Sequence, residues 1–453
     1  MAGSVNVEYA YPFLSAVQND GHRQNLKLAT SGGIAKNPYF FKGLLVNPRR
    51  TAELMLAVSL VSRTRFYSPG ELRERLLAAA DPVVTSGGER LRFEAFSVCC
   101  GAYARLDLRP EAINGEWVGR GTTNVDFNGP MRASLANILP TETVGLNVGT
   151  DGLELEKASE KIVERKVKLP VRWLKGFVEV QSYQSQLKPR LELSAAHAKR
   201  FFSNLPRQEL WYQGLPTYIV PAGSGVRLSQ RETNDAIAVG GAGRLKVFQD
   251  IVRQCNSVRV YSGEQAVTGW EFLFDDCCLF LVLSPSATRG FSGEGQALSQ
   301  LARADGADAL SKIRAALQWD AKIDADRLSA HLKIDRTEIQ SALAMLGARG
   351  LVGYDLSEGA YFHRELPFDL ELVEELQPRL QNARKLVEEN GVRIVRNANG
   401  EIEAYVQGTD VEHRVMFDDK GARCTCPWYS KHPGERGECK HMLAVEIVIG
   451  GEQ

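Results

Sequence analysis

The sequence lacks the features that mark membrane, secreted and strongly charged proteins. Its strongest apolar run begins at Cys277 and is strand-sized, well short of the roughly 20 residues of a membrane-spanning helix. The N-terminus has no basic segment followed by a long apolar one, so we expect no signal peptide. Because 55 Lys and Arg balance 55 Asp and Glu, overall charge does not indicate a nucleic acid or an anionic membrane as partner. We therefore expect a cytoplasmic protein that does not span a membrane and whose thiols stay reduced.

The sequence also lacks a complete catalytic or nucleotide-binding motif. The glycine-rich stretch 238–248 has neither the GK[ST] ending of a phosphate-binding loop nor a full GxGxxG, which favours a turn. The polar stretch 121–129 is more typical of an Asx-rich loop than of a binding site. Four histidines show no nearby base or nucleophile: His22, His197, His331 and His363. We predict that the protein is not an enzyme, with an unrecognised site in residues 1–295 as an alternative.

Local patterns in the first 295 residues predict helices and strands in mixed order. Apolar residues at helical spacing indicate helices at 47–65, 68–80, about 170–184 and 191–206. Alternating or short apolar runs indicate strands at 91–108, 143–156, 217–223, 258–263 and 269–284. A stretch rich in Ser, Gly and Pro then predicts a domain boundary near residue 295.

Residues 298–366 resemble a winged helix-turn-helix. Three helical segments are followed by a hairpin at 351–363, with Asp335 and Glu338 at capping-box spacing and Gly350 at a helix end. Bases would be contacted by residues near the start of the third helix, namely Arg336, Thr337 and Gln340. The segment has nine Lys and Arg against ten Asp and Glu, which favours a protein contact or a scaffold over DNA binding without excluding the latter.

Five of the eight cysteines have no metal-binding pattern. Cys99–Cys100 and Cys277–Cys278 are adjacent pairs, and neighbouring side chains of a strand point to opposite faces. Cys255 stands alone. We expect these five to be small buried apolar side chains.

The other three cysteines and a histidine form a cluster near the C-terminus. Cys424 and Cys426 end a predicted strand on one face, and Cys439 and His441 open an apolar helix after a loop with two prolines and two glycines. Three thiolates and one imidazole are a tetrahedral zinc set with no open position, which indicates structural zinc. Two other histidines are competing ligands: His413 and His432. Of these, His432 lies in the middle of the loop and is expected at the surface. Five nearby cations would offset the net charge of the site or form a binding face: Lys420, Arg423, Lys431, Arg436 and Lys440.

The spacing CxCx12CxH within residues 400–450 resembles the SWIM zinc finger. The resemblance assigns the ligand role to Cys424, Cys426, Cys439 and His441. More loosely, the whole chain resembles bacterial SWIM-containing proteins that are found alongside MoxR-type AAA+ ATPases and von Willebrand factor A-domain proteins. That wider resemblance implies a role in a multi-protein ATPase system and a partner of one of these two kinds.

Together these patterns predict an α+β multidomain protein. Its expected parts are a mixed α+β region (1–160), a β-rich region (161–295), a winged-helix-like module (298–366), a helical connector (367–399) and a ββα-like SWIM zinc finger (400–453). We predict a zinc-binding adaptor that engages a protein or nucleic acid. The alternative is a DNA-binding regulator that uses the winged helix and the finger together.

Overall fold

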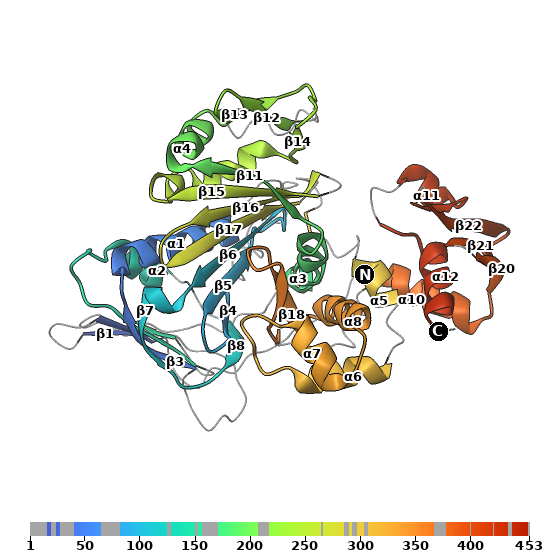
Figure 1. Ribbon diagram of the computed structural model, residues 1–453, viewed down its shortest axis with the longest axis horizontal. Helices are drawn as coiled ribbons and strands as arrows, with labels where there is room; N and C mark the ends of the chain where they lie inside the picture. Colours follow the sequence, from blue (N-terminus) through green and yellow to red (C-terminus); the bar gives the residue numbers. More distant parts are fainter. Residues whose placement is uncertain are drawn as a thin grey trace.

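The protein has a mixed α and β fold with several sheets (Figure 1). The computed structural model describes residues 16–19, 24–27, 40–64, 82–124, 127, 129–149, 153–155, 171–206, 217–263, 266–284, 290–291, 297–302, 307–366, 377–398, 400–419, 421–433 and 437–451. The helix predicted at 68–80 lies outside these residues. Within the described part of the chain, no helix is long and apolar enough to cross a bilayer.

An eight-stranded antiparallel sheet forms the centre of the molecule. Its strand order is β11-β15-β16-β17-β6-β5-β4-β8. In that order the strands are Lys188–Ser194, Ser257–Ser262, Thr268–Leu273, Cys277–Leu283, Ala102–Leu108, Leu91–Phe96, Val83–Ser86 and Gly121–Asn124. β17 pairs with β6, with Cys277 opposite Leu108. The sheet therefore takes strands from both sides of residue 160, and the boundary predicted there does not separate two sheets.

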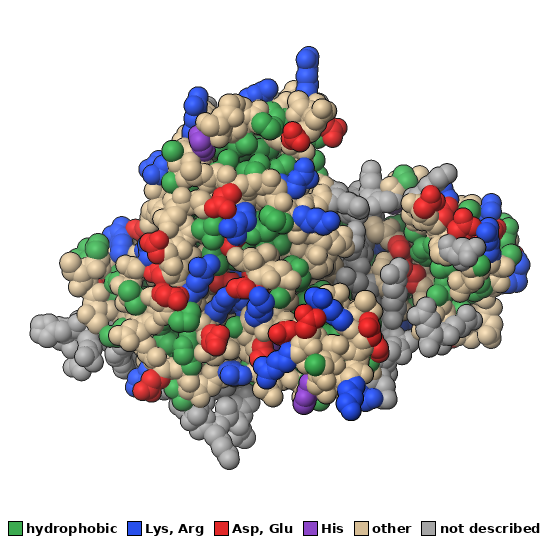
Figure 2. Space-filling view, viewed as in Figure 1, with side chains coloured by type: hydrophobic (Ala, Val, Ile, Leu, Met, Phe, Trp, Pro, Cys, Tyr) green, Lys and Arg blue, Asp and Glu red, His purple; other side chains and the backbone are tan. Residues whose placement is uncertain are grey.

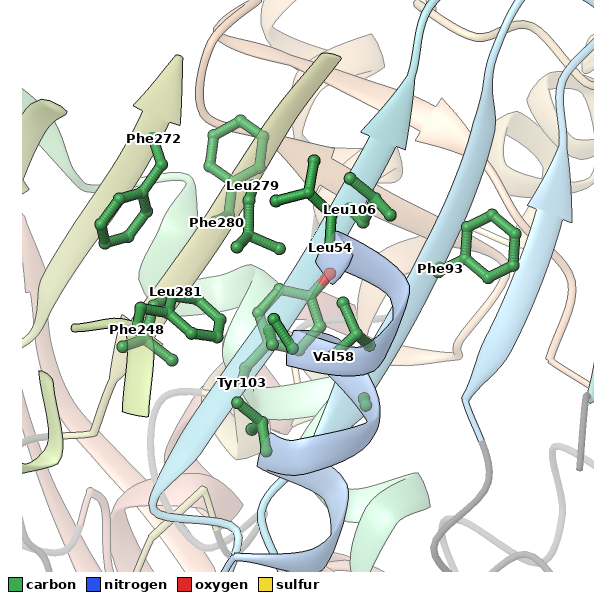
Figure 3. Close-up of a cluster of buried hydrophobic side chains, with 14 of the residues drawn as sticks. Leu54, Val58, Phe93, Tyr103, Leu106, Phe248, Phe272, Leu279, Phe280 and Leu281 are labelled. Carbon is green, nitrogen blue, oxygen red and sulfur yellow. The ribbon is translucent and has the colours of Figure 1, made fainter. Parts of the chain in front are cut away.

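One face of this sheet is apolar and packs on helix α1, Pro48–Arg63. Leu54 and Val58 of α1 lie against Leu106 and its neighbours in the central strands (Figure 3). α1 begins at Pro48, whose missing N–H costs nothing in the first turn. Full burial of each such side chain stabilises the fold by about 1.5–3 kcal/mol.

The opposite face of the sheet carries charge and is covered by a β-hairpin. Its strands are β18 (Val352–Asp355) and β19 (Ala360–His363). Asp355 lies 2.6 Å from the Arg92 guanidinium and 3.0 Å from that of Arg105, and all three side chains are buried. The Phe362 ring lies under Arg92, whose guanidinium carbon is 3.9 Å from the ring centroid. Arg364 pairs with the buried Glu94 at 2.6 Å. The hairpin is thus held to the sheet by buried ion pairs.

Two smaller sheets and six further helical segments complete the described part of the first 295 residues. The six-stranded sheet has the order β1-β2-β10-β9-β3-β7, namely Ala16–Asn19, Gln24–Lys27, Leu153–Leu155, Gly145–Val148, Phe41–Leu45 and Ile113–Trp117. The three-stranded sheet has the order β13-β12-β14, namely Gly225–Ser229, Tyr218–Ala222 and Ile237–Ala238. The remaining α-helices are α2 (Gly129–Ala136), α3 (Val171–Gln184) and α4 (Ala195–Ser203). The 3₁₀ helices are η2 (Pro110–Ala112), η4 (Ala242–Phe248) and η5 (Ile251–Arg253).

The hairpin belongs to a module with a small core of its own. Its helices are α6 (Ala307–Ala316), α7 (Ala325–Leu332) and α8 (Arg336–Ala348). Asp335 caps α8 by accepting from the Thr337 N–H at 2.8 Å, and Gly350 has the positive φ of 73° expected after a helix. The three helices and the hairpin are therefore as predicted. A winged-helix arrangement is not confirmed, because the hairpin packs against the central sheet instead of extending from the module.

The C-terminal module contains a four-stranded antiparallel sheet and three helices. The strands β20 to β23 are Val392–Ala398, Glu401–Gln407, Glu412–Asp418 and Gly421–Cys424, and the helices are α10 (Pro378–Glu388), α11 (Pro427–Lys431) and α12 (Lys440–Gly451). It lies to the right in Figure 1, beside α5 (Ala297–Ala302). Its apolar core also includes Val178 of α3 and Ala348 of α8. The module is therefore packed on the rest of the molecule and is not a free appendage.

Four local predictions differ from the structure. Residues 188–194 form strand β11 and only 195–203 form helix α4, so the helix predicted at 191–206 begins too early. Residues 121–124 are strand β8, not part of a loop, and the glycine-rich stretch continues into η4. The predicted connector 367–399 includes the whole of β20.

The five cysteines without a metal pattern are buried and unbridged, as predicted: Cys99, Cys100, Cys255, Cys277 and Cys278.

Candidate metal centre

The structure brings four predicted side chains together: Cys424, Cys426, Cys439 and His441. Their ligand atoms all lie within 4.8 Å of one another, and each side chain is buried. Strand β23 ends at Cys424, and Cys426 caps the short helix α11. Cys439 immediately precedes α12, and His441 lies in its first turn. The structure thus places the first two at a strand end and the last two at a helix start.

The geometry of this cluster fits a tetrahedral zinc ion. The Nδ1 atom of His441 lies 3.9 Å from the Sγ atoms of both Cys424 and Cys439. Zinc bonds of ~2.3 Å to sulfur and ~2.0–2.1 Å to nitrogen place such atoms ~3.6 Å apart. The His441 nitrogen therefore needs to approach these two sulfurs by only a few tenths of an ångström. The set of three thiols and one imidazole matches the soft ligands that zinc prefers.

The three thiols affect one another's protonation. The hydrogen bond between the Cys424 and Cys426 side chains raises the pKa of Cys424 to about 11 and lowers the pKa of Cys426. Hydrogen bonds to the same two side chains raise the pKa of Cys439. The backbone N–H of Tyr429 also donates to the Cys426 sulfur at 3.4 Å. The cluster therefore favours a thiolate at Cys426, and a metal ion replaces the remaining protons.

Residues 413–450 match the family model of the SWIM zinc finger. The SWIM finger, with its buried cluster of three cysteines and one histidine, holds one structural zinc ion. The match covers the C-terminal segment alone, so it describes this module and not the whole chain.

Comparison with whole proteins adds little. No curated protein matches the chain. Among solved structures, Proliferating Cellular Nuclear Antigen from Entamoeba histolytica is similar, with 13% sequence identity and a TM-score of 0.34. That similarity covers 54% of this chain and 98% of that chain. At such a TM-score it carries no argument about fold or function.

Two other histidines of the SWIM finger lie outside the cluster, and one of them, His413, is next to it. The His413 ring centroid is 4.6 Å from that of His441, and burial lowers the pKa of His413. His432 contacts Trp428 edge to face, with ring centroids 5.4 Å apart. Neither contributes to the group of four. In the described part of the chain, the Nε2 atom of buried His441 has no hydrogen-bond partner, so its ring meets the sulfurs through Nδ1 alone.

The five cations near the finger do not gather into a described basic face. Arg423 pairs with Asp418, and Lys420 and Arg436 lie outside the described residues. Lys431 is exposed and Lys440 is half-buried.

Sequence reasoning missed one residue that touches the site. Arg379 of α10 reaches the loop beside Cys439, and no spacing rule connects it with cysteines about fifty positions later. An arginine in an otherwise ordinary helix gives no signal of such a contact.

Proposed function

We propose that this protein is a non-enzymatic, zinc-braced adaptor whose SWIM finger presents a rigid surface to a protein partner. In this proposal Cys424, Cys426, Cys439 and His441 are the zinc ligands. The observation that supports it is the closed donor set, because four protein atoms within 4.8 Å leave no position for water or a substrate. An ion held in this way stabilises the fold around it.

The exposed face of the finger's sheet supports a protein partner over a nucleic acid. All four arginines of β20, β22 and β23 pair with carboxylates: Arg393 with Glu412, Arg396 with Glu401, Arg414 with Glu403, and Arg423 with Asp418. Binding to phosphates requires cations that are free to replace counterions. Figure 2 shows acidic and basic side chains interspersed over the visible face of the molecule. A surface of mixed sign suits protein recognition.

The partner and location follow from the resemblance of the sequence. A MoxR-type ATPase or a von Willebrand factor A-domain protein from a bacterial cytoplasm is the partner that the resemblance implies. Affinity purification of the full chain, with candidate partners identified by mass, tests this proposal. We expect a partner to be recovered with the native chain and with Cys255→Ser, which removes a buried thiol distant in sequence from the finger. We expect it to be lost with Cys439→Ser. Equal recovery with both variants would contradict the proposal.

A DNA-binding regulator is the alternative. It is favoured by the exposure of Arg336, Thr337 and Gln340 near the start of α8. Against it, Arg336 lies 3.0 Å from Asp326, and the hairpin is held to the central sheet. A salt titration of duplex binding distinguishes the two. A steep loss of affinity with added salt would support the regulator, and the absence of binding at low salt would eliminate it.

A further inference from the structure

One arginine from outside the SWIM match touches both halves of the metal centre. Arg379 lies in the first turn of α10, a helix that packs along α12. Its Nη1 donates to the backbone carbonyl of Glu438 at 2.7 Å. Its guanidinium carbon lies 4.7 Å from the centroid of the Trp428 ring.

These two contacts join the segments that carry the metal ligands. Trp428 follows Cys426 by two residues within α11, and Glu438 immediately precedes Cys439. The ligands otherwise reach the site from a strand end and from a helix start, joined by the loop between α11 and α12. A single planar guanidinium bridges this gap, because it can donate in its plane while an aromatic ring lies against its face.

The charge of the site favours a cation at this place. Zinc with three thiolates and a neutral imidazole carries a charge of 2 − 3 = −1. Arg379 is half-buried beside this centre, where solvent screens its charge less than at an exposed site.

We propose that Arg379 is an outer-sphere positioning residue of the zinc site, which holds the Cys426 segment and the Cys439 segment at the spacing that zinc requires. It also joins the metal centre to α10, and through that helix to the remainder of the molecule. This role concerns metal binding alone, so its test needs no partner and can fail independently of the proposed adaptor function.

Competition between the full-length protein and a zinc chelator of known affinity tests the proposal. We expect Arg379→Ala to weaken zinc binding about 10–100-fold, as for other outer-sphere partners. The zinc affinity of Arg379→Lys should lie between that of the native chain and that of Arg379→Ala, because an ammonium keeps the charge but cannot both donate in a plane and stack. The control is Lys385→Ala, an exposed cation on the same helix that lies ~9 Å further along its axis. We expect the control to bind zinc like the native chain.

Cobalt substitution separates positioning from unfolding. The absorption of bound Co²⁺ reports a tetrahedral site with sulfur ligands. We expect Arg379→Ala to keep this spectrum at saturating metal while requiring more metal to reach it. Loss of the tetrahedral spectrum at saturation would show a general structural role and overturn the proposal.

A double-mutant cycle tests the bridge itself. If Arg379 acts partly through Trp428, the losses of zinc affinity from Arg379→Ala and Trp428→Ala should not add. We expect the double variant to lose less than the product of the two single losses. Strict additivity, unchanged affinity in Arg379→Ala, or an equal loss in Lys385→Ala would each overturn the proposal.

Discussion

Asp355 connects the hairpin to the central sheet through its charge. Its carboxylate is buried between Arg90 of the turn before β5, Arg92 of β5 and Arg105 of β6. Burial alone would raise the pKa of Asp355, but the guanidinium groups of Arg105, Arg92 and Arg90 outweigh it and lower the pKa below its usual value. A lowered pKa means that folding favours the ionised form. The stability from this group is therefore complete above about pH 4 and is lost as the pH falls through the folded-state pKa.

We predict that Asp355→Asn lowers the free energy of unfolding by about 3–5 kcal/mol, because two buried guanidinium groups, those of Arg92 and Arg105, are then left to share the single buried carboxylate of Asp107. Denaturant titration at neutral pH measures the change. Glu412→Gln is the matched control, since its exposed pair with Arg393 should contribute too little to resolve. An equal effect of the two substitutions would show that burial does not set the strength of the pair.

Distance along the chain decides which residue contacts the sequence can predict. The metal centre was predictable because Cys424, Cys426, Cys439 and His441 fall within eighteen residues at spacings that zinc chemistry restricts. The contact between Arg92 and Asp355 joins residues 263 positions apart, and each alone looks like an ordinary surface charge. No local pattern distinguishes such a pair.

The hairpin depends on a small residue in β18. Gly353 lies opposite Phe362 across the hairpin, and a Cβ at this position would come within 2.3 Å of the Phe362 ring. The ring is in turn fixed against Arg92. Because Gly353 has no side chain, the Phe362 ring can occupy the space beside it on the paired strand.

We predict that Gly353→Ala destabilises the protein by about 1–3 kcal/mol, because the displaced ring has no free volume to enter. Thermal unfolding measures the change. Gly129→Ala serves as the control, because a Cβ there meets only Arg132 at an ordinary 3.9 Å. A smaller loss for Gly353→Ala than for the control would contradict this account of the hairpin.

Elements were predictable where one pattern dominated. The helix at 47–65 and the strands at 91–108 and 269–284 have clear periodicity, and the structure confirms them. Residues 191–194 were predicted to be helical because they directly precede helix α4. Their pairing with β15, more than sixty residues later, makes them a strand. Cross-strand partners override local propensity in such short segments.

At the scale of the molecule, the finger shares its apolar core with its surroundings. Val178 and Ala348 from the body pack with α10, α12 and the finger's sheet. Structural zinc contributes roughly 10–16 kcal/mol in isolated finger peptides, which is comparable with the net stability of a domain. Loss of zinc should therefore lower the stability of residues beyond the segment that matches the SWIM model.

We predict that a chelator increases backbone hydrogen exchange throughout residues 377–451, including α10, which lies outside the SWIM match. The central strands β5, β6, β16 and β17 should keep their protection, because their core is a separate cluster. Hydrogen exchange followed by mass spectrometry, with and without chelator, measures both regions. Unchanged exchange at 377–451 would contradict the bracing role of zinc.

The ion pairs beneath the hairpin also set an order of events during synthesis. Arg92 pairs with two aspartates, and it leaves the ribosome 263 residues before the second of them, Asp355. At ~5–20 residues per second, this interval lasts about 13–50 s. Throughout it Arg92 and Arg105 have Asp107 as a partner but lack the second carboxylate, that of Asp355. The charged face of the N-terminal half of the central sheet therefore stays without its covering hairpin until translation has passed residue 364.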